Sequence, residues 1–241
     1  MLFRLYNPAK KWYNKKEGWK EAFAFLIQAV IFELNGVLVD TDLFSRRVWK
    51  LMAKEQGLPF DDRINEKLKS MTFAEGLEFL LRKAKRSYSL AEKVALSARQ
   101  SDLYSEQIDA LTQKDMLPGA LEALKTAKEK GVKIAVAGAG ENTRGILWRL
   151  KLGALVDTVV DESLVHASLP DPAVLLLAGN RLGVPPENCL AIMDSLPGVE
   201  GALRGNMKTV AVGKAAGCEF AAARGETMED IDLLSLLNEE K

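Results

Sequence analysis

The chain has 241 residues, 48% of them hydrophobic, which is enough to bury one large core or a core with an inserted subdomain. Its 33 basic and 33 acidic residues balance, so no overall field attracts nucleic acid or an anionic membrane, and we expect no nucleic-acid partner. Two cysteines without metal-ligand spacing point to a reducing compartment, and a single histidine excludes a histidine-based zinc site.

Residues 1–25 mix cations with aromatic side chains. This segment has six basic residues but only two acidic ones, Glu17 and Glu21. Its aromatic residues are Phe3, Tyr6, Trp12, Tyr13, Trp19, Phe23 and Phe25. This composition fits an extra helix packed on the domain or a poorly ordered leader. It equally fits a docking surface for an unknown protein partner, an anionic membrane or RNA, because aromatic side chains among cations suit all three.

A hydrophobic run follows over Ala22–Phe32, interrupted by Gln28 and ended by Glu33. It is too short to cross a bilayer as a helix, and no small-residue cleavage site follows it. We interpret it as a core strand with its approach. The sequence therefore predicts no membrane span and a cytoplasmic protein.

From Thr41 to about Asp115 the pattern is helical throughout. An apolar stripe predicts a first helix, which ends at Gly57-Leu58-Pro59. Asp40 can cap the start of this helix. Three further helices are expected over residues 61–69, 73–85 and 89–111. With no strand signal between them, residues 41–115 predict a small helical cap.

After Met116 helices and strands alternate. Strands are expected over residues 133–137, 156–160, 189–193 and 208–212, and helices over 118–131, 142–150, 171–183 and 197–205. Such alternation is typical of a parallel sheet covered on both faces. The sequence thus predicts an α/β protein: a doubly wound parallel-sheet core of residues 26–40 and 116–241, the helical cap over 41–115, and the N-terminal extension over 1–25.

In doubly wound sheets the ligand crevice lies beyond the carboxyl ends of the strands. Residues 33–36, 138–142, 168–170 and 193–195 are expected there. The first of these segments belongs to the run Ala-Val-Ile-Phe-Glu-Leu-Asn-Gly-Val-Leu-Val-Asp-Thr over residues 29–41, a buried strand that enters a glycine-broken turn.

This run resembles the first motif of the haloacid dehalogenase-like phosphotransferases, and the resemblance to their β-phosphoglucomutase branch covers roughly residues 27–213. It implies that Glu33 stands at the position of the aspartate nucleophile and Asn35 at that of the general acid/base. The second motif, at 138–142, reads Gly-Ala-Gly-Glu-Asn and lacks the phosphate-binding hydroxyl. The degenerate phosphate-binding positions are therefore Gly138, Ala139 and Asn142.

The later motifs are altered as well. Leu169 replaces the lysine that neutralises the phosphate, and the metal-associated fourth motif keeps only Asp194. In the cap, Ser45 and Phe73 stand at the positions of a histidine and of a phosphate-gripping arginine. Glu33, the Asn35 carbonyl and Asp194 predict at most weak Mg²⁺ binding. A phosphate there would meet Glu33, Glu141 and Asp194 with no lysine to offset the charge.

These substitutions predict a catalytically inactive or severely impaired relative with a binding or regulatory role, because a general acid/base typically contributes ~10²–10⁴-fold. Two alternatives stay open. One is a slow Mg²⁺-dependent sugar-phosphate phosphatase or phosphomutase that uses Glu33 and Asp194. The other is an adaptor that acts through residues 1–25.

Overall fold

The computed structural model describes residues 26–69, 71–138, 142–165 and 167–238. The chain divides into two compact units, each described here by itself. The sheet unit contains Met1–Leu38, Leu117–Thr143 and Gly153–Lys241, and the helical unit contains Val39–Met116 and Arg144–Leu152. The N-terminal extension over 1–25 lies outside the described residues.

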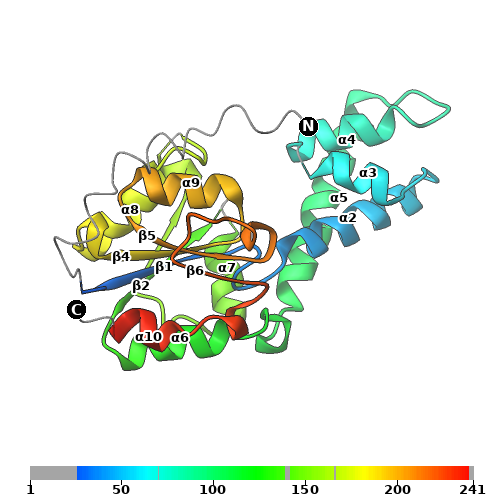
Figure 1. Ribbon diagram of the computed structural model, residues 1–241. Coiled ribbons are helices and arrows are strands. Elements are labelled where there is room, and N and C mark those ends of the chain that lie inside the picture. Colours follow the sequence, from blue (N-terminus) through cyan, green and yellow to red (C-terminus); the bar gives the residue numbers. More distant parts are fainter. Residues whose placement is uncertain (1–25, 70, 139–141, 166, 239–241) are drawn as a thin grey trace, which may run out of the picture. The chain divides into compact units, whose positions relative to one another are not determined.

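The sheet unit is built on six parallel strands in the order β3-β2-β1-β4-β5-β6 (Figure 1). Their bounds are β1 Ala29–Glu33, β2 Lys133–Gly138, β3 Thr158–Asp161, β4 Cys189–Met193, β5 Lys208–Val212 and β6 Ala223–Gly225. The first four residues of β1 are buried, as expected for a central strand covered on both faces. The central position of β1 places Glu33 between the ends of β2 and β4.

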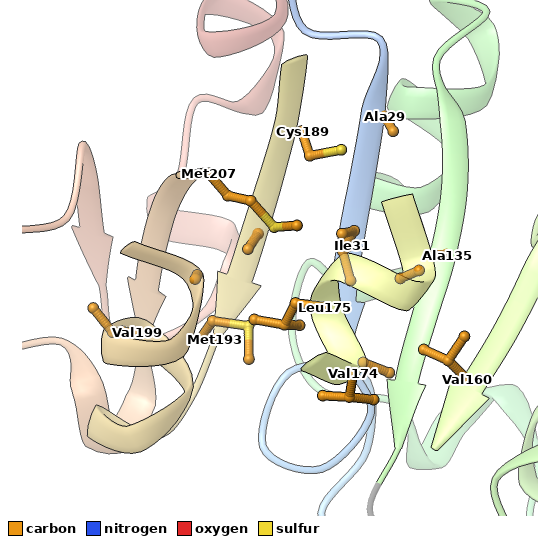
Figure 2. Close-up of a cluster of buried hydrophobic side chains, with 14 of the residues drawn as sticks. Ala29, Ile31, Ala135, Val160, Val174, Leu175, Cys189, Met193, Val199 and Met207 are labelled. Carbon is orange, nitrogen blue, oxygen red and sulfur yellow. The ribbon is translucent and has the colours of Figure 1, made fainter. Parts of the chain in front are cut away.

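Helices cover the sheet on both faces (Figure 1). Their bounds are α6 Ala120–Glu129, α8 Ala173–Leu182, α9 Leu196–Arg204 and α10 Leu233–Asn238. Helices α8 and α9 pack with the strands into one apolar cluster, in which Ile31 and Leu175 are fully buried (Figure 2). The predicted fold class, a doubly wound parallel sheet with an inserted helical cap, is confirmed.

The helical unit contains α2 Thr41–Glu55, α3 Asp62–Leu68, α4 Phe73–Leu81 and α5 Leu90–Asp109. Each helix begins at a side-chain cap, which satisfies backbone N–H groups that have no partner inside the helix. Asp40 accepts the N–H of Leu43 at 3.2 Å, as predicted. Thr72 and Ser89 form capping boxes with the glutamates three residues later.

Helix α4, helix α7 and strand β6 depart from the sequence prediction. Helix α4 ends at Leu81, not at residue 85; cations crowd the next turn, and like charges one helical turn apart disfavour a helix. Helix α7, Thr143–Arg149, groups mainly with the helical unit, where Arg149 pairs with Asp109. Strand β6 was not predicted because three residues without apolar alternation carry no strand signal.

Among the described residues, no helix has the length and apolar composition needed to cross a membrane.

Candidate functional site

Glu33, the last residue of β1, is held by the turn that follows β4. The backbone N–H of Asp194 donates to Glu33 Oε2 at 2.7 Å, and the hydroxyl of Ser195 donates to Glu33 Oε1 at 3.3 Å. Burial raises the pKa of the Glu33 carboxyl from its ordinary value of 4.5 to about 7, and the Asp194 charge adds to the increase while the Asp194 N–H opposes it. The predicted nucleophile position therefore carries a carboxyl group that is partly protonated near neutral pH.

Asp194 lies at the end of β4 and is only 5% exposed. Its Oδ1 accepts the backbone N–H of Lys214 at 2.9 Å, and its Oδ2 lies 3.3 Å from the Lys214 ammonium. The prediction that no lysine lies at these strand ends is wrong. A charge-assisted pair with one buried partner compensates the Asp194 carboxylate.

Two glycines with positive φ enclose the Asp194 carboxylate. Gly36 has φ +75° and Gly213 has φ +52°. A Cβ atom on Gly36 would lie 2.1 Å from Asp194 Oδ2, and one on Gly213 would lie 2.2 Å from Asp194 Oδ1. Both turns approach the carboxylate more closely than any residue with a side chain allows.

At the end of β2 the described residues are Gly138 and, after a gap, Asn142 and Thr143. Thr143 is 3% exposed, and its Oγ1 would lie 1.9 Å from a Cβ on Gly138. The predicted position Asn142 is exposed. The predicted residues Ala139 and Glu141 lie outside the described part of the chain.

Leu169, a predicted phosphate-binding position, packs against the apolar cluster under α8 and α9. Its Cδ2 would lie 3.0 Å from a Cβ on Gly201 in α9. This side chain therefore contributes to the core of the sheet unit. The cation at the strand ends comes instead from Lys214, directly after β5.

In the helical unit, Phe73, which the sequence places at a predicted arginine position, forms an aromatic cluster. Its ring packs edge-to-face against Trp49 at 6.1 Å and against Tyr104 at 5.6 Å between centroids. Ser45 hydrogen-bonds with Tyr104, whose pKa is raised by burial and by the Asp42 charge while the Ser45 bond opposes the increase. Phe73 therefore makes apolar ring contacts within the helical unit.

Ser195 has two roles at this site, and its removal tests both. Its Oγ accepts the N–H of Gly198 at 3.1 Å as the N-cap of α9, and its hydroxyl donates to Glu33. We expect Ser195→Ala to lower the free energy of unfolding by about 1 kcal/mol, measured by urea denaturation. Ser195→Thr keeps the hydroxyl and should stay close to the unmodified chain; an equal loss in both variants would contradict this role.

The chain matches known proteins over most of its length. Residues 27–206 match the family model described as hydrolase, haloacid dehalogenase-like hydrolase. A β-phosphoglucomutase from Bacillus subtilis is 35% identical over 217 residues, covering 89% of this chain and 95% of that protein. A phosphorylated-carbohydrates phosphatase from Thermotoga maritima is 31% identical over 179 residues, covering 73% of this chain and 80% of that protein.

Solved structures agree with these matches. The crystal structure of β-phosphoglucomutase from Clostridium difficile aligns with a TM-score of 0.69 at 30% identity, covering 85% of this chain and 93% of that one. The structure described as a putative β-phosphoglucomutase from Thermotoga maritima aligns with a TM-score of 0.74 at 28% identity, covering 89% of this chain and 100% of that one. The chain belongs to the haloacid dehalogenase-like hydrolases and is homologous to β-phosphoglucomutase.

Proposed function

We propose that this chain is a non-catalytic member of the β-phosphoglucomutase-like branch, which keeps the scaffold for binding or regulation. The proposal rests on the hydrogen bonds that the Glu33 carboxylate accepts. Both of its carboxylate oxygens accept hydrogen bonds from the turn after β4. A nucleophile for phosphoryl transfer must instead direct an oxygen at the phosphorus atom in line with the leaving group.

Protonation makes the Glu33 carboxyl group a still poorer nucleophile. Because burial raises the pKa of Glu33 to about 7, a large fraction of the side chain is neutral under physiological conditions, and a neutral carboxyl is a poor nucleophile. The longer glutamate side chain also displaces the carboxyl by one methylene from the place an aspartate would give it. Displacements of about an ångström strongly affect catalysis by positioning.

Asn35 removes the second chemical group. An amide neither gives nor takes a proton as a carboxyl group does, and loss of a general acid/base typically costs ~10²–10⁴ in rate. Two independent losses, one at the end of β1 and one two residues later, support a chain that no longer turns over sugar phosphates.

The test is turnover of glucose phosphates with Mg²⁺, compared between the unmodified chain and Glu33→Ala. We expect both proteins to give the same rate as the buffer control. Robust turnover that disappears in Glu33→Ala would end the proposal. Correct folding of both proteins is checked by far-UV circular dichroism, so that an inactive result cannot come from unfolding.

A slow phosphatase or phosphomutase that uses Glu33 and Asp194 is the second candidate. The Lys214 ammonium beside Asp194 favours it, since a cation at the strand ends can offset the charge of a phosphate. In that case Glu33→Asp combined with Asn35→Asp should raise the turnover. An unchanged rate in the double variant would count against this candidate. The third candidate, an adaptor that acts through residues 1–25, concerns residues outside the described structure and stays a prediction.

A further inference from the structure

Each carboxylate oxygen of Glu33 and Asp194 has a partner within the protein. Asp194 Oδ1 accepts the Lys214 N–H at 2.9 Å, and Asp194 Oδ2 faces the Lys214 ammonium at 3.3 Å. Glu33 Oε2 and Oε1 accept from the Asp194 N–H and the Ser195 hydroxyl. A metal ion at Asp194 Oδ2 would compete with the Lys214 ammonium for the same negative charge.

Space around Asp194 is equally restricted. The backbones of Gly36 and Gly213 approach its two oxygens so closely that a Cβ atom on either glycine would lie within 2.2 Å of the carboxylate. Mg²⁺ requires several oxygen ligands in nearly octahedral geometry and keeps water molecules of its own. Within the described part of the chain, no group of three or more His, Cys, Asp or Glu side chains is placed to hold a metal ion. With the Lys214 ammonium 3.3 Å from Asp194 Oδ2, these donors do not fit Mg²⁺.

Members of this family typically use Mg²⁺, so the positive charge at the site must have another source here. We propose that the Lys214 ammonium is a built-in cation that takes the electrostatic place of the divalent metal at Asp194. The negative charge of Asp194 is then compensated without a metal ion. This assignment is compatible with the proposed loss of catalysis but does not depend on it.

The exposure of the two partners supports this assignment. The Asp194 side chain is 7% exposed and the Lys214 side chain 62% exposed. The carboxylate is thus largely removed from solvent, while the Lys214 side chain is exposed to it. A buried carboxylate without a partner is strongly destabilising, so Lys214 compensates a charge that solvent cannot.

The test compares melting temperatures with and without millimolar Mg²⁺, at ionic strength matched with NaCl because salt weakens ion pairs. We expect no Mg²⁺-dependent shift for the unmodified chain. Lys214→Met keeps the length of the side chain and removes its charge, so it should melt about 3–6 °C lower without Mg²⁺. Mg²⁺ should restore part of that loss, because it can now reach the uncompensated carboxylate.

Two control variants fix the interpretation. Lys214→Arg keeps the charge and should behave as the unmodified chain. Lys125→Met removes the cation of the surface pair with Glu122 on α6 and should show no Mg²⁺ response.

The proposal is overturned by a Mg²⁺-dependent rise in the melting temperature of the unmodified chain, or by a Lys214→Met variant that is as stable as the unmodified chain. A Lys214→Met variant that melts lower but ignores Mg²⁺ also overturns it. If Lys214→Met does not fold, Mg²⁺ titration of the unmodified chain and of Lys214→Arg decides: heat of binding in either contradicts the proposal, and none in both supports it. None of these readouts depends on turnover, so they are independent of the test for catalysis.

Discussion

Replacing Gly36 by alanine should lower the free energy of unfolding of the sheet unit by about 3 kcal/mol, from backbone strain and from a displaced Asp194. Gly36 has φ +75°, where an L-residue with a side chain is disfavoured by roughly 1–2 kcal/mol. The new Cβ atom would also lie 2.1 Å from Asp194 Oδ2 and 2.2 Å from Asp194 Cγ. Both distances are far shorter than any van der Waals contact.

Asp194 cannot move aside without losing its partners. Its oxygens are bound to the Lys214 N–H and ammonium, and its side chain is buried. Breaking such a contact to a buried charged group costs about 1–3 kcal/mol. The expected measurement is a lower urea midpoint, followed by far-UV circular dichroism.

Gly131→Ala is the matched control. Gly131 has φ +70° and a Cβ atom there would meet nothing within 4 Å, so the substitution adds the backbone strain without the clash. It should cost about 1–2 kcal/mol. Losses in Gly36→Ala and Gly131→Ala that agree within experimental error would contradict the role assigned to Asp194.

The same substitution in an Asp194→Gly variant separates the clash with Asp194 from the backbone strain. Asp194→Gly removes the three Asp194 atoms that the new Cβ atom would meet at 2.1, 2.2 and 2.6 Å. In that background Gly36→Ala should cost only the backbone strain, which makes the two substitutions non-additive by about 1–2 kcal/mol. An unchanged cost in both backgrounds would show that the clash does not matter.

The fold could be predicted from the sequence because its signals are local. A change from helical periodicity alone to alternating helices and strands at Met116 marks the end of the inserted helices and the return to the sheet. Buried strands without alternation predict a parallel sheet, as β1 and β4 demonstrate.

The site was predicted less completely, because its contacts join segments far apart in the sequence. The hydrogen bond between Glu33 and the Asp194 N–H spans 161 residues, and no periodicity encodes it. Lys214 was missed although it follows a predicted strand, over 208–212, by two residues. The rule that ligand crevices lie beyond the carboxyl ends of parallel strands indicates this position as well.

Leu169 shows what the sequence does not predict about a residue at a motif position. The sequence predicts that Leu169 stands at the position of a lysine, but it does not predict the contact of Leu169 with the core. A substitution at a motif position predicts which chemistry is lost. It does not predict where the new side chain packs, or which other residue supplies the missing charge.

Replacing Glu33 by glutamine should stabilise the sheet unit at alkaline pH by roughly 2–3 kcal/mol and leave it unchanged at acid pH. Burial raises the pKa of Glu33 in the folded chain to about 7, against its ordinary value of 4.5 in the unfolded chain. Between these two values the folded state holds a proton that the unfolded state has released. The stability that Glu33 contributes is therefore fully present below pH 4.5 and is lost as the pH rises through 7.

Glutamine never ionises, and its amide can keep both hydrogen bonds. Its Oε1 can accept the Asp194 N–H, and its NH₂ group can donate to the Ser195 hydroxyl. The free energies of unfolding of Glu33→Gln and of the unmodified chain, measured in urea in metal-free buffer, should coincide near pH 4.5 and diverge up to about pH 8. Parallel pH profiles would mean that Glu33 is not protonated more readily in the folded chain.

Glu92→Gln supplies a control of opposite sign. The Ser89 N–H and then Arg86 lower the pKa of Glu92 to about 2, so its carboxylate contributes stability that is present above pH 4.5 and is lost as the pH falls towards 2. Glu92→Gln should therefore reduce stability at neutral pH, whereas Glu33→Gln increases it above pH 7. A gain in both variants would trace the effect to the removal of one negative charge from the whole chain. Opposite signs would trace it to the buried environment of Glu33 at the end of β1.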